Sequence, residues 1–258
     1  MSYRFSFSGI DGSGKSTTID EVSKTLASNG CKVIHASRPS WFDTEGEDRR
    51  YMATKINVFF DFLHGWADAH RYRSLVGIVN VGYCEVRRLI EKYGENKFKP
   101  NIVLVGRDSS LDPFAYSTYY FPFTRNLSSE MRMQIVSSLL CKPRSDKVFY
   151  FDVDPNIAYE RILQRIDREK KYGAKNRAKW SHMHENPDDL KFLQEQFEIS
   201  IELLVKEDGA NIIRLDATKS QENVVQEILF NIGRVVNNTR QELLPKRETY
   251  LGIAKRIA

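Results

Sequence analysis

Apolar positions recur with two different periods along the chain. Residues 4–8 alternate aromatic and polar side chains, which is typical of a β-strand. Residues 102–105 form a short continuous apolar run, which is typical of a strand buried on both faces. Short apolar segments at residues 32–36, 147–153 and 211–215 predict further strands. The pattern therefore predicts five strands.

The segments between these strands carry apolar residues every three or four positions, which predicts helices with one buried face. Residues 15–28, 188–205 and 225–235 show this period. Pro155 opens another helix at its first turn, where proline is tolerated. Strands and helices thus alternate along the chain, as in a parallel sheet with helices on both faces.

One long segment, residues 42–93, separates the second and third expected strands. It is charged and mostly helical in pattern, and we expect breaks near Gly65 and Gly77. No internal repeat or low-complexity linker divides the 258 residues, a length that suits one large α/β domain. We therefore predict a three-layer α/β/α sandwich with a five-stranded parallel sheet over residues 1–236. The polar and basic tail at residues 237–258 is interpreted as an appended arm or a solvated helix.

Composition adds only broad limits. Apolar residues make up 41% and charged residues 28%, which is ordinary for a globular protein. Cys31, Cys84 and Cys141 show neither metal-ligand spacing nor a disulfide framework, which fits a reducing compartment. Because no signal peptide and no membrane-length apolar stretch is present, we expect a cytoplasmic protein without a membrane partner. The net charge of +5 suits a polyphosphate ligand as well as nucleic acid.

The segment GIDGSGKS, residues 9–16, satisfies the pattern G-x-x-x-x-G-K-[ST] and lies between an expected strand and an expected helix. Its glycines allow the chain to curl so that backbone N–H groups point at phosphate oxygens, and the helix adds its positive end. Lys15 is expected to reach the β- and γ-phosphates, and the Ser16 hydroxyl to bind Mg²⁺. We therefore predict that the chain binds ATP with Mg²⁺. The residues expected to bind the nucleotide here are Gly9, Asp11, Gly12, Ser13, Gly14, Lys15, Ser16 and Thr17.

The wider segment FSGIDGSGKSTTI, residues 7–19, resembles the phosphate loop of the thymidylate kinase family, among the P-loop nucleoside monophosphate kinases. Other similar segments follow in the family's order: RP at 38–39, VGRD at 105–108, AY at 115–116 and DAT at 216–218. The resemblance identifies the chain as a divergent member. It implies a P-loop NTPase fold and transfer of the ATP γ-phosphoryl group to a nucleoside monophosphate, deoxythymidylate.

Arg161, Arg165 and Arg168 stand four and three residues apart, so they share one face of the helix that Pro155 opens. The segment resembles the arginine-rich lid of the family, at about residues 161–185. A positive flap that closes over the triphosphate would exclude water and neutralise the charge of the moving phosphoryl group. The alternative interpretation is a solvated, charged helix.

The acceptor side of the chain departs from the family pattern. Gly106 stands where the family has an aspartate at the strand end, Asp108 lies two positions later, and Asp112 falls in a pair that adds one residue before the AY segment. Arg38 stands where a glutamate is expected. An arginine there suits an acceptor that already carries a phosphate, because an anionic phosphate needs countercharge rather than a strong base. Asp108 as a base would instead suit a hydroxyl acceptor.

The resemblance also assigns roles to single residues. The expected catalytic residues are Lys15, Arg107, Asp108, Arg165 and Arg168. The residues expected to face the acceptor are Asp11, Arg38, Arg71, Arg107 and Tyr116. Ser16 and Asp108 are expected to hold Mg²⁺, and Arg161 and Ala217 to contact the bound ATP. Relatives commonly dimerise through helices on one side of the sheet, so a homodimer is implied as well.

Three functions remain open at this point. The first is phosphoryl transfer to a nucleoside monophosphate. The second keeps the kinase but changes the acceptor to a nucleoside, a modified nucleotide or another small metabolite. The third is a nucleotide-binding switch or nucleic-acid-associated ATPase, suggested by the charge of +5 and the basic tail. Because the basic residues concentrate in the expected lid, we do not expect a nucleic-acid partner.

Overall fold

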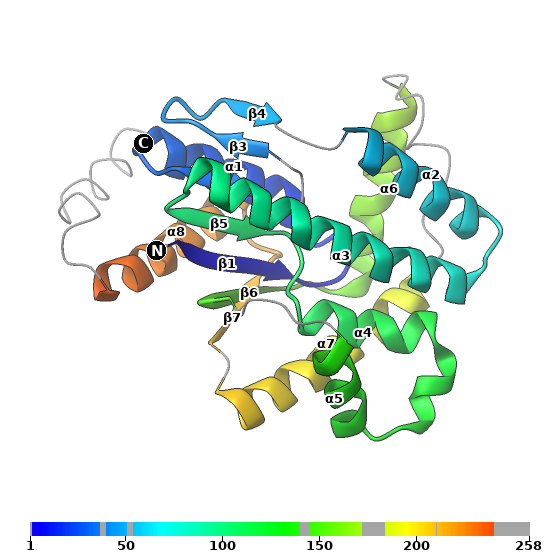
Figure 1. The fold of residues 1–258 in the computed structure, drawn as a ribbon. Helices are drawn as coiled ribbons and strands as arrows, with labels where there is room; N and C mark the ends of the chain where they lie inside the picture. The colour runs from blue at the N-terminus through cyan, green and yellow to red at the C-terminus, as the bar shows by residue number, and fades with distance from the viewer. Residues whose placement is uncertain are drawn as a thin grey trace.

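The computed structural model describes residues 2–36, 40–50, 54–139, 145–171, 184–209 and 211–239. Its centre is a seven-stranded sheet with the order β4-β3-β2-β5-β1-β6-β7 (Figure 1). The parallel strands are β1 (Tyr3–Ser8), β2 (Val33–His35), β5 (Ile102–Val105), β6 (Lys147–Asp152) and β7 (Ile212–Asp216). The predicted parallel α/β sheet is confirmed, with β1 between β5 and β6.

Two strands beyond the predicted five extend one edge of this sheet. The strands β3 (Ser40–Phe42) and β4 (Asp48–Arg50) are antiparallel, and β3 pairs with β2. The predicted helix was therefore wrong at residues 42–50. The turn between the strands explains the difference, because the Asp43 carboxylate accepts the backbone N–H groups of Glu45 and Glu47 at 3.1 Å each. Gly46 completes the turn with a φ of 80°, which favours glycine.

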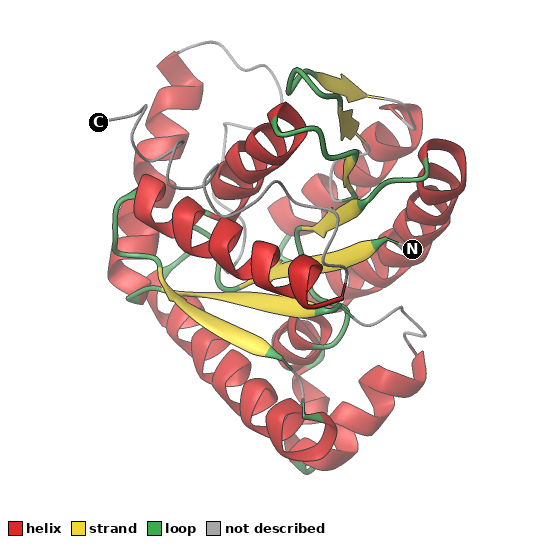
Figure 2. Ribbon diagram, turned by 90° about the vertical axis from the view of Figure 1, so that its left-hand side faces the viewer, coloured by secondary structure: helices red, strands yellow, loops and turns green. Residues whose placement is uncertain are grey.

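Helices cover both faces of the sheet (Figure 2). Their bounds are α1 (Lys15–Ser28), α2 (Thr54–Ala69), α3 (Arg73–Phe98), α4 (Leu111–Tyr120), α5 (Ser129–Leu139), α6 (Pro155–Lys171), α7 (Pro187–Asp208) and α8 (Gln221–Thr239), with a 3₁₀ turn at Pro122–Asn126. Helices α1 and α8 pack together, whereas α4 packs on α3 and α7 (Figure 1). The three-layer arrangement predicted from the alternation is thus present.

The breaks predicted inside the long helical segment were misplaced. Gly65 lies within α2 and Gly77 within α3, and the chain turns instead at residues 70–72, where Arg71 has a φ of 59°. A Cβ atom at Gly77 would lie 2.7 Å from the Phe121 ring. This glycine therefore serves the close packing of α3 against the end of α4 rather than a break.

Aromatic side chains from neighbouring strands form the centre of the core. Phe5 and Phe7 of β1 are fully buried, and the Phe7 and Phe149 rings lie 5.3 Å apart. On the same strand as Phe149, Tyr150 packs on Phe197 of α7 at 5.7 Å. Burial of large aromatic side chains supplies much of the hydrophobic stabilisation of such a core.

The sequence pattern predicted neither α4 nor α5. The apolar side chains of α4 and Asp112 are buried, so this helix is covered on nearly every side. Such a helix shows no polar face and hence no amphipathic period. In the ranges that the structure describes, no helix is long and apolar enough to cross a bilayer.

Candidate active site

The phosphate-binding pattern forms a loop at the carboxyl end of β1, the central strand, and leads directly into α1. Gly9, Gly12 and Gly14 have φ values of 139°, 83° and 92°, which favour glycine. A Cβ atom would lie 2.7 Å from the Phe151 carbonyl oxygen at Gly9 and 2.2 Å from the Ala158 carbonyl oxygen at Gly12. The glycines thus allow the loop to curl tightly against β6 and α6.

The ammonium group of Lys15 is held by the loop itself. Its Nζ donates to the carbonyl oxygens of Gly9 and Ile10 at 2.7 and 2.8 Å and to the Ser13 hydroxyl at 3.1 Å. Burial lowers the pKa of Lys15, although the charge of Asp11 opposes this change. The Lys15 side chain therefore folds back onto the loop's own carbonyl groups. The loop thus presents a positive charge together with backbone N–H donors.

Asp11, Arg107 and Tyr116, three residues predicted to face the acceptor, lie together beside this loop. Asp11 Oδ1 is 4.0 Å from Arg107 Nη2, and the Tyr116 hydroxyl donates to Asp11 Oδ2 at 3.4 Å. The Arg107 guanidinium stacks over the Tyr116 ring at 5.0 Å. Burial opposes ionisation of Asp11, but His184, Arg107 and Lys15 together hold its pKa well below the ordinary value.

His184 joins this group from the far end of the lid region, and sequence reasoning missed it. Its Nε2 lies 2.6 Å from Asp11 Oδ2, and its Nδ1 lies 3.2 Å from the Tyr120 hydroxyl. The ring is buried and meets Tyr116 and Tyr119 edge-on at 5.5 and 5.8 Å. A lone histidine 173 positions from its partner gives no local signal in a single sequence.

Asp108 stabilises the turn that leads from β5 into α4. Its Oδ2 accepts the Ser6 hydroxyl at 2.7 Å, and its Oδ1 accepts the backbone N–H groups of Ser110 and Leu111 at 2.8 and 3.1 Å. Both oxygens of the carboxylate assigned to Mg²⁺ from the sequence are therefore used by the fold.

Asp112, in the first turn of α4, is a second buried carboxylate at the same place. Its Oδ2 accepts the Ser8 hydroxyl at 2.5 Å and the Asp108 backbone N–H at 2.9 Å, whereas its buried Oδ1 has no hydrogen-bond partner. Burial raises the pKa of Asp112 to about 6 against the opposing charges of Arg107 and Lys15. The sequence had indicated no role for Asp112 beyond its place in the pair that adds one residue before the AY segment.

These residues fit Mg²⁺. Ser16 stands exposed at the first turn of α1, and Asp112 Oδ1 is a buried oxygen that lacks a protein donor. No group of three or more histidine, cysteine or acidic side chains gathers within the described ranges. Mg²⁺ takes one or two carboxylates together with phosphate and water oxygens, so the Ser16 hydroxyl and Asp112 Oδ1 are oxygens of the kind that suit this ion.

The arginines of the expected lid have separate partners. Arg161 Nη2 donates to the Ala217 carbonyl oxygen at 3.0 Å, which brings together the two residues predicted to contact the bound ATP. Arg165 pairs at 2.6 Å with Glu185, whose side chain is 1% exposed. Arg168 Nε donates to the Gln164 carbonyl oxygen within α6. Residues 172–183 of the expected lid lie outside the described residues.

Two further residues were predicted to face the acceptor. Arg38 lies outside the described residues, as do residues 240–258 of the basic tail. Arg71 is exposed at the junction of α2 and α3.

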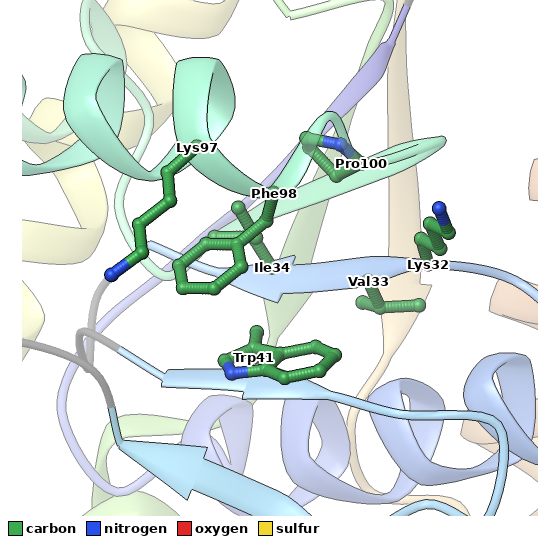
Figure 3. A pocket seen from close by; sticks show the side chains of 7 residues that line it. All are labelled: Lys32, Val33, Ile34, Trp41, Lys97, Phe98 and Pro100. Atoms are coloured by element: carbon green, nitrogen blue, oxygen red, sulfur yellow. The ribbon is translucent and has the colours of Figure 1, made fainter.

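A pocket of about 240 Å³ lies elsewhere, between the start of β2 and the end of α3 (Figure 3). Trp41 and Phe98 stack at 5.2 Å in its wall. The lining residues are Lys32, Val33, Ile34, Trp41, Lys97, Phe98 and Pro100. The pocket adjoins the amino ends of the parallel strands, whereas ligands of open α/β sheets bind at the carboxyl ends, so it is separate from the phosphate loop.

Comparisons with known proteins agree with this geometry. The family model described as thymidylate kinase matches residues 7–228. A thymidylate kinase from Leptospira borgpetersenii serovar Hardjo-bovis is 27% identical over 225 residues, covering 86% of this chain and 89% of the relative. A thymidylate kinase from Bacillus velezensis is 27% identical over 168 residues, covering 64% and 69%.

Among solved structures, deoxyadenosine kinase from M. mycoides with bound dATP superimposes with a TM-score of 0.53 at 15% identity, covering 90% of this chain and 99% of that one. This likeness shows a shared fold. Since the family model matches most of the chain and the phosphate loop has the geometry described above, the chain belongs to the thymidylate kinase family and is an ATP-dependent kinase.

Proposed function

We propose that this kinase transfers the γ-phosphoryl group of ATP to a nucleoside monophosphate, deoxythymidylate. An oxygen of the acceptor phosphate forms a bond to the γ-phosphorus, the bond to the β,γ-bridging oxygen breaks, and ADP leaves with the nucleoside diphosphate as second product. The observation that carries the proposal is the group of Asp11, Arg107 and Tyr116 directly beside the phosphate loop. The acceptor named for the relatives is thymidylate.

Charge neutralisation and positioning supply the catalysis, because phosphoryl transfer needs little covalent help from the protein. Lys15 and the backbone N–H groups of the loop bind the β- and γ-phosphates, and Ser16 holds Mg²⁺. The ion held there would supply positive charge to neutralise the charge that develops on the phosphate oxygens. Asp108 was the carboxylate predicted to join Ser16, and it accepts hydrogen bonds from Ser6 and from the turn after β5.

Arg107 is the residue that we assign to the acceptor phosphate. Its guanidinium is always charged, can bind a phosphate bidentately, and is 42% exposed while it rests on the Tyr116 ring. Tyr116 then faces the acceptor base, and Asp11 its sugar hydroxyl. Arg38 and Arg71 remain predictions for the same acceptor.

The helix α6 and residues up to about 185 serve as the lid over the triphosphate. Arg161, already bonded to the Ala217 carbonyl oxygen, stands at the nucleotide end of this helix. Arg165 and Arg168 follow on the same face and complete the countercharge when ATP is bound. The proposed phosphoryl donor is Mg²⁺-bound ATP. The proposed location is the cytoplasm, where Cys31 would stay reduced.

A nucleoside acceptor is the second candidate, and one observation favours it. The half-buried Asp11 is hydrogen-bonded to the buried His184 beside Tyr116, and this pair would accept a proton from an attacking hydroxyl group. A phosphate acceptor needs no such base. The two candidates thus differ in the chemistry required of the same residues.

A panel of acceptors tests the two candidates. ATP labelled on the γ-phosphate is offered with Mg²⁺ and each deoxynucleoside monophosphate or deoxynucleoside in turn. We expect label in deoxythymidine diphosphate and none in products of the nucleosides. Label in a nucleoside monophosphate would establish the second candidate instead, and acceptor-independent hydrolysis of ATP would refute both.

We also propose that two copies of the chain associate through α2 and α3. These helices pack against one another and expose large apolar side chains, among them Phe62 at 67%, Ile78 at 60% and Leu89 at 60%. Exposed apolar patches of this kind mark interaction surfaces. A second copy is the partner that the family resemblance implies.

A further inference from the structure

The two carboxylates that follow β5, Asp108 and Asp112, differ in the hydrogen bonds that they accept. Asp108 accepts three hydrogen bonds, from the Ser6 hydroxyl and from the N–H groups of Ser110 and Leu111. Asp112 accepts two, both on Oδ2, and its Oδ1 is buried without a donor. Both oxygens of the first carboxylate thus accept hydrogen bonds, whereas the second retains one oxygen without a donor.

A buried oxygen of this kind is costly. A carboxylate out of water loses solvation that only hydrogen bonds or cations can replace. Asp112 is 4% exposed, and its hydrogen bond to Ser8, the residue directly before Gly9, places it beside the phosphate loop. Such a group at the mouth of an anion-binding loop is suited to a cation that arrives with the anion.

Position also favours Asp112. Gly106 follows β5 directly, so no carboxylate stands at the end of that strand. Asp112 reaches the same edge of the sheet from the first turn of α4, since its Oδ2 is bonded to Ser8, the last residue of β1. The insertion before Tyr116 thus returns a carboxylate to the sheet edge from which one is missing.

We propose that Asp112, and not Asp108, supplies the carboxylate for the Mg²⁺ of the bound ATP, with Oδ1 accepting a hydrogen bond from a water of the ion's hydration shell. Mg²⁺ dehydrates reluctantly and usually keeps several waters, so a carboxylate behind the loop meets the ion through one of them. Asp108 stabilises the turn after β5, and the Ser16 hydroxyl remains the proposed ligand of the ion. The proposal rests on the proposed function, because the ion arrives with ATP.

The test compares Asp112→Asn with Asp108→Asn, since both remove one charge from the same turn. ATP binding is titrated by calorimetry with excess Mg²⁺ and again with EDTA, and the ratio of the two affinities gives the enhancement by the metal. Mn²⁺ in place of Mg²⁺ allows electron paramagnetic resonance to count the ions bound per ATP complex. Thermal unfolding of both variants confirms that they are folded.

We expect Asp112→Asn to reduce the enhancement about 10-fold or more, as substitution of groups around a metal's ligands commonly does, with little change in EDTA. Asp108→Asn should retain the enhancement. An enhancement that Asp112→Asn retains would overturn the assignment, whether or not Asp108→Asn loses it. If the unaltered chain binds ATP neither with nor without Mg²⁺, the proposed function itself fails, which is a separate result.

Discussion

His184 Nε2 lies 2.6 Å from Asp11 Oδ2, so a residue near the end of the expected lid, the first described after residues 172–183, is hydrogen-bonded directly to the phosphate loop. The same histidine is 3.2 Å from the Tyr120 hydroxyl of α4. Three separate parts of the chain therefore meet at one ring. Asp11 Oδ2 is engaged by His184 and Tyr116, whereas Oδ1 lies 4.0 Å from Arg107 Nη2, so Oδ1 is the oxygen that we expect to reach the proposed acceptor.

This bond predicts that His184 positions Asp11 for the acceptor. His184→Gln should raise KM for the acceptor about 10-fold, a loss of roughly 1.4 kcal/mol, while KM for ATP changes little. In a cycle with Asp11→Asn, the double variant should be no worse than Asp11→Asn alone. Tyr119→Phe, which removes a hydroxyl bonded to Asp189 and not to Asp11, is the matched control. Additive losses in the cycle would show that His184 acts independently of Asp11.

Lys15→Ala should abolish turnover. The variant loses the cation that neutralises the transferred phosphoryl group, and loss of one such contact commonly costs on the order of 100-fold to 1,000-fold in kcat. Lys24→Ala is the control, because Lys24 lies exposed on the same helix and its ammonium group pairs with Glu21 at 3.7 Å. Turnover is measured as acceptor-dependent release of ADP. Near-normal turnover by Lys15→Ala would contradict the assignment of the loop.

Gly12→Ala should destabilise the fold strongly. Its Cβ would lie 2.2 Å from the Ala158 carbonyl oxygen, at a φ of 83°. Gly30→Ala separates the two costs, because Gly30 has a φ of 86° but nothing within 4 Å. Gly30→Ala should cost about 1–2 kcal/mol, the penalty of left-handed backbone, and Gly12→Ala clearly more. Urea unfolding measures both, and equal costs would mean that the loop can move away from α6.

The stability of the chain without nucleotide should fall as the Asp112 carboxyl ionises. The pKa of this group is about 6 in the folded chain against an ordinary 3.8, with Arg107, Lys15 and Asp108 as the charged groups that act on it. Since the folded chain binds the proton more tightly, the group stabilises the fold at pH below about 4, and this stability is lost as the pH rises through about 6.

Asp112→Asn cannot titrate at this position. The difference between the free energy of unfolding of this variant and that of the unaltered chain should therefore increase between about pH 4 and 6, by up to about 3 kcal/mol. Urea titrations across this range measure the difference, in which the titration of other carboxylates cancels. A difference that does not change with pH would show that Asp112 ionises normally in the fold.

Phe62→Glu should weaken the proposed association of two copies. A charge placed at an apolar contact opposes burial, so the variant should sediment as a monomer at concentrations where the unaltered chain is a dimer. Phe230→Glu is the control, because Phe230 is similarly exposed, at 64%, on α8. Analytical ultracentrifugation measures all three chains. A monomeric unaltered chain would contradict the proposed dimer.

Much of the fold could be predicted from local pattern. The five parallel strands and α1 agree with their predicted ranges to within about two residues, because a strand or helix period is present in the residues of the element itself. The β3–β4 turn was missed although Asp43 and Gly46 carry its signal, since the surrounding charged pattern favoured a helix. Helix α4 was missed because it is buried on nearly every side.

The sequence alone determined the phosphate loop and the family, because glycines, lysine and serine at set spacings between a strand and a helix act through the local backbone. Only the tertiary structure decided which carboxylates are free to act. Asp108 and Asp112 lie four positions apart, yet both oxygens of Asp108 accept hydrogen bonds from Ser6 and from its own turn, while Asp112 keeps a buried oxygen without a donor. That difference, like the bond from His184 to Asp11, arises from hydrogen bonds and burial between residues far apart in the chain, which no local spacing records.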